Sequence, residues 1–371
     1  MSEPGGQHER LEAGPAGAGR RARLVAAAYR WRVSLLCAGI FAVMSAVAPR
    51  FATPGNFANI VKGTTTNLPA AVAFTVVLIA GQLDLSVGSA MTMGGILVMG
   101  LQPQLGWAGA FAAAIACGLL VGLANGLLVA KARINSFIVT LGTMIIVTNA
   151  MAIYCGGGTI PAESFAVSDW LQDPLLGGSD AGEAVRWLTG WLTPRNLLPM
   201  ILLAASAGFL ARTPAGRGFY LVGANPRTAW YSGLRVDATV IAAFVVSGGL
   251  SALGGAMVAM GEAAGSLKLG ENSLMAIVAA AIIGGTSMEG GKGSVIGTAI
   301  ALAALTALIN GLSCLGAQHE VKLMASGMVL AMVILYDAYW LYLRRRTRGQ
   351  RKDLLAELRH PAVRPRERTT P

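Results

Sequence analysis

The chain alternates between long apolar stretches and short polar intervals from about residue 32 to residue 343. An apolar stretch of about 20 residues is what an α-helix needs to cross the hydrocarbon core of a bilayer. The stretches are continuous and lack the every-second-residue alternation of barrel strands, so helices are the predicted elements. We expect membrane spans at 32–49, 66–81, 87–102, 106–130, 136–154, 196–211, 239–260, 273–287, 294–315 and 320–343. The predicted fold class is an all-α polytopic membrane protein with about ten transmembrane helices and discontinuous segments.

Charged residues lie mostly outside these stretches and indicate the orientation of the chain. They make up 13% of the sequence and hydrophobic residues 54%, whereas charged residues are about a quarter of an average soluble domain. With ten spans both termini lie on one side, and the intervals on that side hold 23 of the 29 Lys and Arg residues. Because Lys and Arg favour the cytoplasmic side, both termini are predicted to be cytoplasmic. The net charge of +11 therefore reflects membrane topology, and we expect no nucleic-acid partner.

This pattern divides the chain into three regions. Residues 1–31 form a basic cytoplasmic tail that we expect to be disordered, 32–343 form the transmembrane domain, and 344–371 form a second basic cytoplasmic tail. No cleavage site of the A-x-A kind closes the first apolar stretch, so that stretch is expected to stay in the membrane.

Two longer polar intervals lie within the transmembrane domain, an outer one at 155–195 and an inner one at 212–238. In the inner interval the pair Asn225-Pro226 favours a turn that starts a helix. Residues 226–234 are therefore predicted to form a short helix at the cytoplasmic surface.

A Gly-rich polar break at 81–89 interrupts the apolar pattern. It contains Asp84, and an ionisable group between two apolar segments is costly unless it is paired or faces water or protein. Two interpretations remain open and are compatible. Asp84, Ser86 and Ser89 cap a helix that begins near Val87, or the break is a discontinuous helix that lines a translocation path.

A similar break suggests a weak internal repeat. Residues 283–295 repeat the pattern of 78–90, in which a Gly-centred polar break ending in Gly-Ser separates two apolar runs. The triplet Asn-Gly-Leu also recurs, at 125–127 and 310–312. Both breaks are predicted to lie toward the cytoplasm, so the repeat would be parallel rather than inverted.

The sequence contains no constellation expected of an enzyme or a metal site. The second break resembles a phosphate loop, but Lys292 is followed by Gly293 where the P-loop pattern requires Ser or Thr. The cysteines and histidines lack metal-ligand spacing. The chain is therefore predicted to have no catalytic residues, no metal and no bound cofactor.

Polar side chains within the spans are uncharged and few, and buried acids that would couple transport to protons are not evident. Together with the first break, these residues give a candidate substrate path. It comprises Asp84, Ser86, Ser89, Asn125, Asn149 and Asn310.

Four segments in order resemble a known family: GQLDLSVGSAM (81–91), NGLLVAKARINSFIVTLGTM (125–144), GRGFYLVGANPRTAWYSGLRV (216–236) and AAIIGGTSMEGGKGSVIGT (280–298). The chain resembles the membrane permease subunits of ribose/xylose-type carbohydrate ABC importers, within the branched-chain permease superfamily. The stretch DLSVG resembles the corresponding sequence in the sugar-transporting branch of this superfamily rather than that in the amino-acid branch.

The resemblance implies a permease subunit of an ATP-driven importer that moves a monosaccharide or related polyol across the bacterial inner (plasma) membrane. It implies a cytoplasmic ATPase subunit that uses the ATP, a periplasmic or extracytoplasmic sugar-binding protein, and a dimer with a second permease copy or paralogue in the lipid bilayer. Alternatives are a permease for branched-chain amino acids or nucleosides, or a self-contained secondary carrier. The sequence names neither the sugar nor the permease partner.

The resemblance also implies that 216–235 is the loop that docks on the ATPase. The pairs Pro226-Arg227 and Trp230-Tyr231 depart from the family, which more often has small or charged residues at these positions. The implied coupling residues are Gly216, Arg217, Gly223, Asn225, Pro226, Ser232 and Gly233.

Overall fold

A computed structural model describes residues 33–173, 175, 191–318, 320–322, 324–329, 331, 332 and 335 of the chain. The chain divides into two compact units, Met1–Lys322 and Leu323–Pro371. The described residues of the second unit are helical. The predicted tails and half of the residues of the predicted span 320–343 lie outside the described residues.

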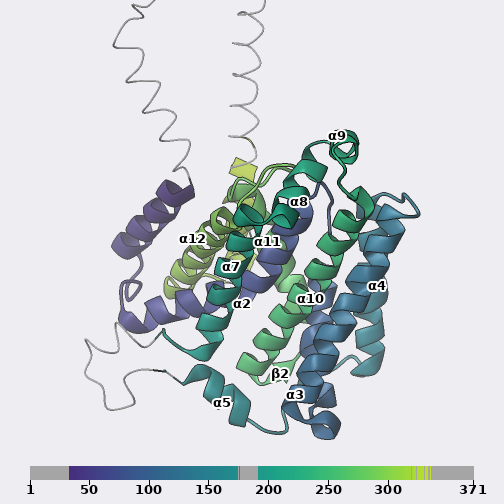
Figure 1. The fold of residues 1–371 in the computed structure, drawn as a ribbon. Coiled ribbons are helices and arrows are strands. Elements are labelled where there is room, and N and C mark those ends of the chain that lie inside the picture. The colour runs from purple at the N-terminus through teal and green to yellow at the C-terminus, as the bar shows by residue number, and fades with distance from the viewer. Residues whose placement is uncertain are drawn as a thin grey trace, which may run out of the picture. The chain divides into compact units, whose positions relative to one another are not determined.

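In the described residues of the first unit, the elements are helices and one very short pair of strands (Figure 1). Strands β1 (Ile160–Pro161) and β2 (Ala264–Gly265) pair antiparallel and join two intervals that were both predicted to be outer. The helices are Val33–Val47, α2 (Pro54–Ile79), α3 (Ser86–Ala130), α4 (Ser136–Tyr154), α5 (Ala166–Gln172), α7 (Pro194–Arg212), α8 (Pro214–Ala224), α9 (Pro226–Tyr231), α10 (Val236–Glu262), α11 (Lys268–Ile283) and α12 (Val295–Cys314).

Five of the described helices, α3, α4, α7, α10 and α12, are long and apolar enough to cross a membrane. The structure confirms the bounds predicted for α4. The bounds of most other described helices lie within a few residues of the predicted ones. Helix α2 differs, because it begins at Pro54 rather than residue 66. The Thr53 side chain accepts a hydrogen bond from the Asn56 N–H, and proline suits the first helical turn. Helix α11 is also shifted toward the N-terminus of its predicted span.

Helix α3 folds back on itself. A straight helix of 45 residues would be about 67 Å long at 1.5 Å per residue, roughly twice the thickness of a bilayer core. Gly106 interrupts it with φ 65° and ψ 175°, a conformation that glycine adopts readily. The Asn125 Nδ2 donates a hydrogen bond to Ser86 Oγ at 2.9 Å, although 39 residues separate them. The two arms of α3 correspond to the separate helices predicted at 87–102 and 106–130.

Helix α10 lies between the two arms of α3, in direct backbone contact with both. A Cβ atom added to Gly248 would overlap the carbonyl oxygen of Gly118 on the second arm. One added to Gly255 would overlap the carbonyl oxygen of Met91 on the first arm. Small residues allow such close approach between membrane helices. The centre of this unit is therefore a helix whose glycines replace side-chain packing with backbone packing.

We expect Gly248→Ala to destabilise the protein by about 1–3 kcal/mol, the usual cost of forcing extra atoms into a packed core. The control is Gly142→Ala on α4, because a Cβ there meets nothing within 4 Å. Thermal unfolding of the purified protein in detergent measures both. Equal midpoints for the two variants would show that the α3–α10 contact is looser than described.

Candidate functional site

The first polar break is closed around a buried carboxyl group. Asp84 is 1% exposed. Its Oδ1 accepts hydrogen bonds from the Ser86 N–H at 3.0 Å and the Ser86 hydroxyl at 2.5 Å. Its Oδ2 accepts one from the Ser247 hydroxyl of α10 at 2.7 Å. Both oxygens therefore have partners, and in the described part of the chain no Lys, Arg or His forms an ion pair with Asp84.

The network continues into the second arm of α3 and into α4. Asn125 donates to Ser86 Oγ, and its own Oδ1 accepts a hydrogen bond from the Thr143 hydroxyl at 2.6 Å. The polar groups in this chain of contacts are buried, except that Thr143 is partly buried. Buried polar groups of this kind are costly unless satisfied, and a satisfied network favours one arrangement of the helices.

Two hydroxyl groups of α4 satisfy the backbone of the break itself. The Leu83 N–H donates to Ser136 Oγ at 3.2 Å, and the Leu85 N–H donates to Thr140 Oγ1 at 3.1 Å. Irregular backbone at membrane depth requires partners from neighbouring helices. The Ser and Thr side chains at the start of α4 provide them.

The predicted capping role is correct for Asp84 and wrong for the two serines. Helix α3 begins at Ser86, and its cap residue Leu85 makes no side-chain bond. Asp84 accepts the Ser86 N–H instead. The Ser89 hydroxyl donates to the Ser86 carbonyl, so it serves the helix interior rather than its end.

The structure unites only part of the predicted substrate path. Asp84, Ser86 and Asn125 share the network, and Ser89 adjoins it. Asn149 is exposed and donates to the Ile145 carbonyl of its own helix at 2.8 Å. Asn310 lies on α12, where its Oδ1 accepts from the Cys314 thiol.

Ser247 and Thr143 also belong to the network, although neither was among the predicted path residues. Their only sequence signal is a polar side chain within an apolar span, which does not reveal the partner.

The two polar breaks meet the end of α8 at a glycine junction, formed by Gly81, Gly223, Gly290 and Gly291. A Cβ on Gly223 would overlap the Ile79 carbonyl oxygen, and one on Gly290 would lie 2.5 Å from Gly81 Cα. The Gly291 N–H donates to the Ile79 carbonyl at 2.9 Å. The inner interval of the chain therefore contacts both breaks through backbone atoms.

A hydroxyl contact reinforces this junction. The Tyr220 OH of α8 donates to the Gly293 carbonyl of the second break at 3.2 Å. Farther along α2 from the junction, the hydroxyl oxygens of Thr75 on α2 and Thr298 on α12 lie 2.9 Å apart and are buried. The segments around the two breaks are thus in contact at two places, at the glycine junction and between α2 and α12.

The two breaks also begin with the same backbone turn. At the end of α2 the Gly81 N–H bonds the Leu78 carbonyl and the Gln82 N–H bonds the Val77 carbonyl. At the end of α11 Gly285 and Thr286 bond Ile282 and Ala281 with the same spacings. Both central glycines have positive φ, 77° and 90°. This is the Schellman end of a helix, which α9 and α12 also have.

The inner interval folds into two short helices, α8 and α9. The predicted helix at 226–234 is confirmed as α9, with Pro226 in its first turn, and Asn225 caps it by accepting the Thr228 N–H at 3.1 Å. Ser232 and Gly233 follow at its exposed end. At the other end of the interval, Gly216 packs against the Phe209 carbonyl of α7, whereas Arg217 is exposed.

Beside α9 lies a polar groove of about 590 Å³. Lys131 and Arg133, which precede α4, pair with Asp237 at 3.2 and 3.1 Å and join two intervals predicted to be cytoplasmic. The Trp230 and Tyr231 side chains on its rim are 64% and 81% exposed. Large exposed aromatic side chains are typical of protein interaction surfaces.

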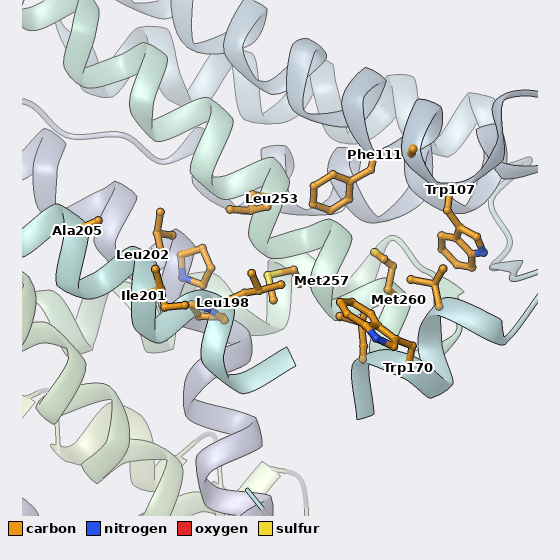
Figure 2. Close-up of a pocket in the computed structure, with 15 residues that line it drawn as sticks. Trp107, Phe111, Trp170, Leu198, Ile201, Leu202, Ala205, Leu253, Met257 and Met260 are labelled. Carbon is orange, nitrogen blue, oxygen red and sulfur yellow. The ribbon is translucent and has the colours of Figure 1, made fainter. Parts of the chain in front are cut away.

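A different pocket, of about 530 Å³, opens between α3, α5, α7 and α10 (Figure 2). Figure 2 shows Trp107 and Phe111 of α3 facing Met257 and Met260 of α10, with Trp170 of α5 beside them. The lining is almost entirely apolar. Specific binding of a sugar requires placed hydrogen-bonding groups, so this pocket is a poor sugar site.

The fold and these sites define a multi-pass membrane protein in which a polar loop, the interval with α8 and α9, packs onto two helix breaks. The sequence pattern of the family described as "Branched-chain amino acid transport system / permease component" matches residues 56–335. The chain belongs to this family. It is a membrane permease, a transport subunit rather than an enzyme.

Similar proteins include the ribose import permease protein RbsC of Escherichia coli strain K12, 30% identical over 80% of this chain and 90% of the relative. RbsC of Bacillus subtilis strain 168 is 30% identical over 80% and 88%. The autoinducer 2 import system permease protein LsrC of E. coli strain SMS-3-5 is 34% identical over 72% and 74%. No solved structure matches the chain significantly.

We expect Ser247→Ala to destabilise the protein by about 1–3 kcal/mol, because it leaves an oxygen of the buried Asp84 carboxyl group without its hydrogen bond. Ser251→Ala is the matched control one turn further along α10, since Ser251 Oγ is buried and has no hydrogen-bond partner in the described part of the chain. Denaturation of both variants in detergent tests the network. A loss in Ser251→Ala as large as that in Ser247→Ala would contradict it.

Proposed function

We propose that this chain is the transmembrane permease subunit of an ATP-driven importer for a monosaccharide or related polyol. The observation that carries the proposal is the alignment with ribose import permeases over nine tenths of the E. coli RbsC chain. The LsrC relative is named for the import of autoinducer 2, so the substrate class is broader than ribose alone. The alternatives are branched-chain amino acids or nucleosides, and a self-contained secondary carrier.

The proposed fold has about ten spans in the inner membrane, with both termini and both tails, 1–31 and 344–371, on the cytoplasmic side. Pairing of Lys131 and Arg133 with Asp237 supports a common side for those two intervals. The β1–β2 pair supports a common side for the outer intervals. The breaks after α2 and α11 begin with the same turn and meet at one junction, which supports a parallel repeat.

The proposed partners are a cytoplasmic ATPase subunit, which uses the ATP, an extracytoplasmic sugar-binding protein, and a second permease copy or paralogue. Helices α8 and α9, with the coupling residues Gly216 to Gly233, form the proposed docking surface for the ATPase. The glycine junction supports this role, because a displaced α8 would push directly on both breaks. Close-packed backbones transmit such a shift rather than absorb it.

The proposed mechanism is alternating access. Movement of α8 and α9 by the ATPase changes the angle of the helices on either side of the breaks and opens a path to the cytoplasm. Asp84, Ser86, Ser89 and Asn125 hold the first break during this movement, close to the path. Asn149 and Asn310 stay proposed path residues outside that network. The hydrogen bonds of the network are mutually satisfied, so a tightly binding sugar site in this part of the path is not required.

Cells lacking this chain should lose uptake of one labelled sugar, and a plasmid copy should restore it. A panel of pentoses, hexoses, polyols, branched-chain amino acids and nucleosides identifies the substrate. Unchanged uptake of every sugar would contradict the proposal, and loss of amino-acid or nucleoside uptake would favour the alternative. Uptake that survives deletion of the ATPase subunit but stops with the proton gradient would indicate a secondary carrier.

Replacing Trp230 and Tyr231 with Ala should weaken co-purification of the ATPase subunit about 30-fold or more, because exposed aromatic anchors contribute about 2 kcal/mol or more at protein interfaces. Sugar uptake should fall with it, at an unchanged amount of permease in the membrane. Trp170→Ala is the control, since Trp170 is 57% exposed and lies on α5 in the outer interval. Normal ATPase binding by the double variant would place the docking surface elsewhere.

A further inference from the structure

A polar pocket of about 480 Å³ lies at the opposite end of α2 from the glycine junction. It is bounded by the first half of α2, the start of α7, the end of α10 and the start of α11. In the proposed orientation it faces the extracytoplasmic side. Its polar lining includes Lys62, Thr66, Asn67, Arg195, Glu262 and Lys268.

Arg195 is the unusual member of this lining. It is 4% exposed. Its Nη2 donates to Thr66 Oγ1 at 3.2 Å, but Nε and Nη1 find no hydrogen-bond acceptor in the part of the chain that the structure describes. A buried guanidinium group with unused donors is destabilising by several kcal/mol. Such a side chain is expected where a ligand supplies the missing acceptors.

The position of this guanidinium group is fixed by its surroundings. It lies so close to the backbone of α10 that a Cβ on Gly261 would overlap it. The neighbouring Asn196 accepts a hydrogen bond from the Thr65 hydroxyl at 2.8 Å, and both are buried, so α7 is locked to α2 beside the pocket. The surrounding contacts therefore hold the guanidinium group of Arg195 in place at the pocket.

The charge around the pocket is strongly unbalanced. Lys62, Arg195 and Lys268 carry positive charges, and Glu262 is the one acid among the described residues that line the pocket. Helices α7 and α11 also begin here, and the N-terminal end of a helix favours a negative charge. Lys62 Nζ donates a hydrogen bond to Gln172 Oε1 at 3.3 Å, which is a neutral partner.

We propose that this pocket binds an oxyanion, a phosphate or carboxylate group, with Arg195 as the principal ligand and Lys62 and Lys268 as supporting charges. The planar guanidinium fork matches the two oxygens of such a group. The oxyanion comes from one of two sources, a dissolved small molecule or the phosphate of an anionic phospholipid. The proposal does not depend on which substrate the permease transports.

The first experiment uses the full-length permease in an uncharged detergent. Its unfolding temperature is titrated with sodium phosphate against sodium chloride at equal ionic strength, because a ligand that binds the native state raises that temperature in a saturating way. In parallel, native mass spectrometry measures retention of phosphatidylglycerol against phosphatidylcholine. A phosphate-specific rise identifies a site for dissolved oxyanions, and selective retention of phosphatidylglycerol identifies a lipid site.

Variants decide whether the pocket is responsible. Arg195→Gln should weaken the binding at least about tenfold, the loss of one charge-assisted contact of about 1.4 kcal/mol or more. Arg195→Lys keeps the charge without the fork and should be intermediate. Glu262→Gln should strengthen binding severalfold, an effect that a purely structural role would not give. Arg50→Gln, at an exposed position outside the lining residues, is the control and should bind as the parent does.

The proposal is overturned if the parent protein shows neither a phosphate-specific rise nor selective lipid retention. It is also overturned if Arg195→Gln binds as Arg50→Gln does. Should Arg195→Gln fail to fold, Lys62→Gln and Glu262→Gln take its place, because the pocket requires shifts of opposite sign for these two. Shifts of the same sign, or none, would reject it.

Discussion

Direct contact between helix backbones is the constraint on which the rest of this structure depends. Lipid is as apolar as leucine, so helices in a membrane associate through packing and hydrogen bonds rather than through the hydrophobic effect. Helix α10 meets both arms of α3 where Gly248 and Gly255 leave no side chain between the backbones. The glycine junction uses the same device between α8 and the two breaks. Hydrogen bonds then act at the places where the backbone departs from a helix. Asp84 bonds Ser86 and Ser247, and hydroxyl groups of α4 satisfy the Leu83 and Leu85 amides.

Much of this arrangement could be predicted from the sequence, because apolar length and breaker residues report on single helices. The pattern predicted α4, both arms of α3, and the short helix after Asn225. It missed the first 12 residues of α2, which include Lys62 and Thr65. A polar stretch of this kind has the hydropathy of an interval outside the membrane, whereas Thr65 is buried against Asn196. The partner of Asp84 was also not predictable, since Ser247 is 163 residues away and a polar residue in a span does not name its partner.

The resemblance implied that the inner loop docks on the ATPase, and the structure shows that the residues of this loop differ in their contacts. Gly216 and Gly223 pack against other parts of the permease, so a larger residue at either position would disturb folding. Asn225 shapes the loop by capping α9. Trp230 and Tyr231 are the residues that face outward with large apolar surfaces. Two of the four positions at which this chain departs from the family are thus exposed aromatic residues, which fits the proposed docking surface.

Helices α2 and α11 connect the two ends of the molecule. The first half of α2 lines the oxyanion pocket with Lys62, and α11 begins there with Lys268. Each helix ends at a polar break that contacts or adjoins the glycine junction. Helix α2 contains Pro69 between these two ends, and at the junction end a hydroxyl contact fixes α2 to α12. A displacement of α8 that tilts α2 or α11 therefore changes the spacing of the cations at the far end. By reciprocity, an oxyanion that binds one spacing better than the other favours one position of α8. On this argument, oxyanion binding in the proposed pocket and ATPase binding at the proposed docking surface are coupled through α2 and α11.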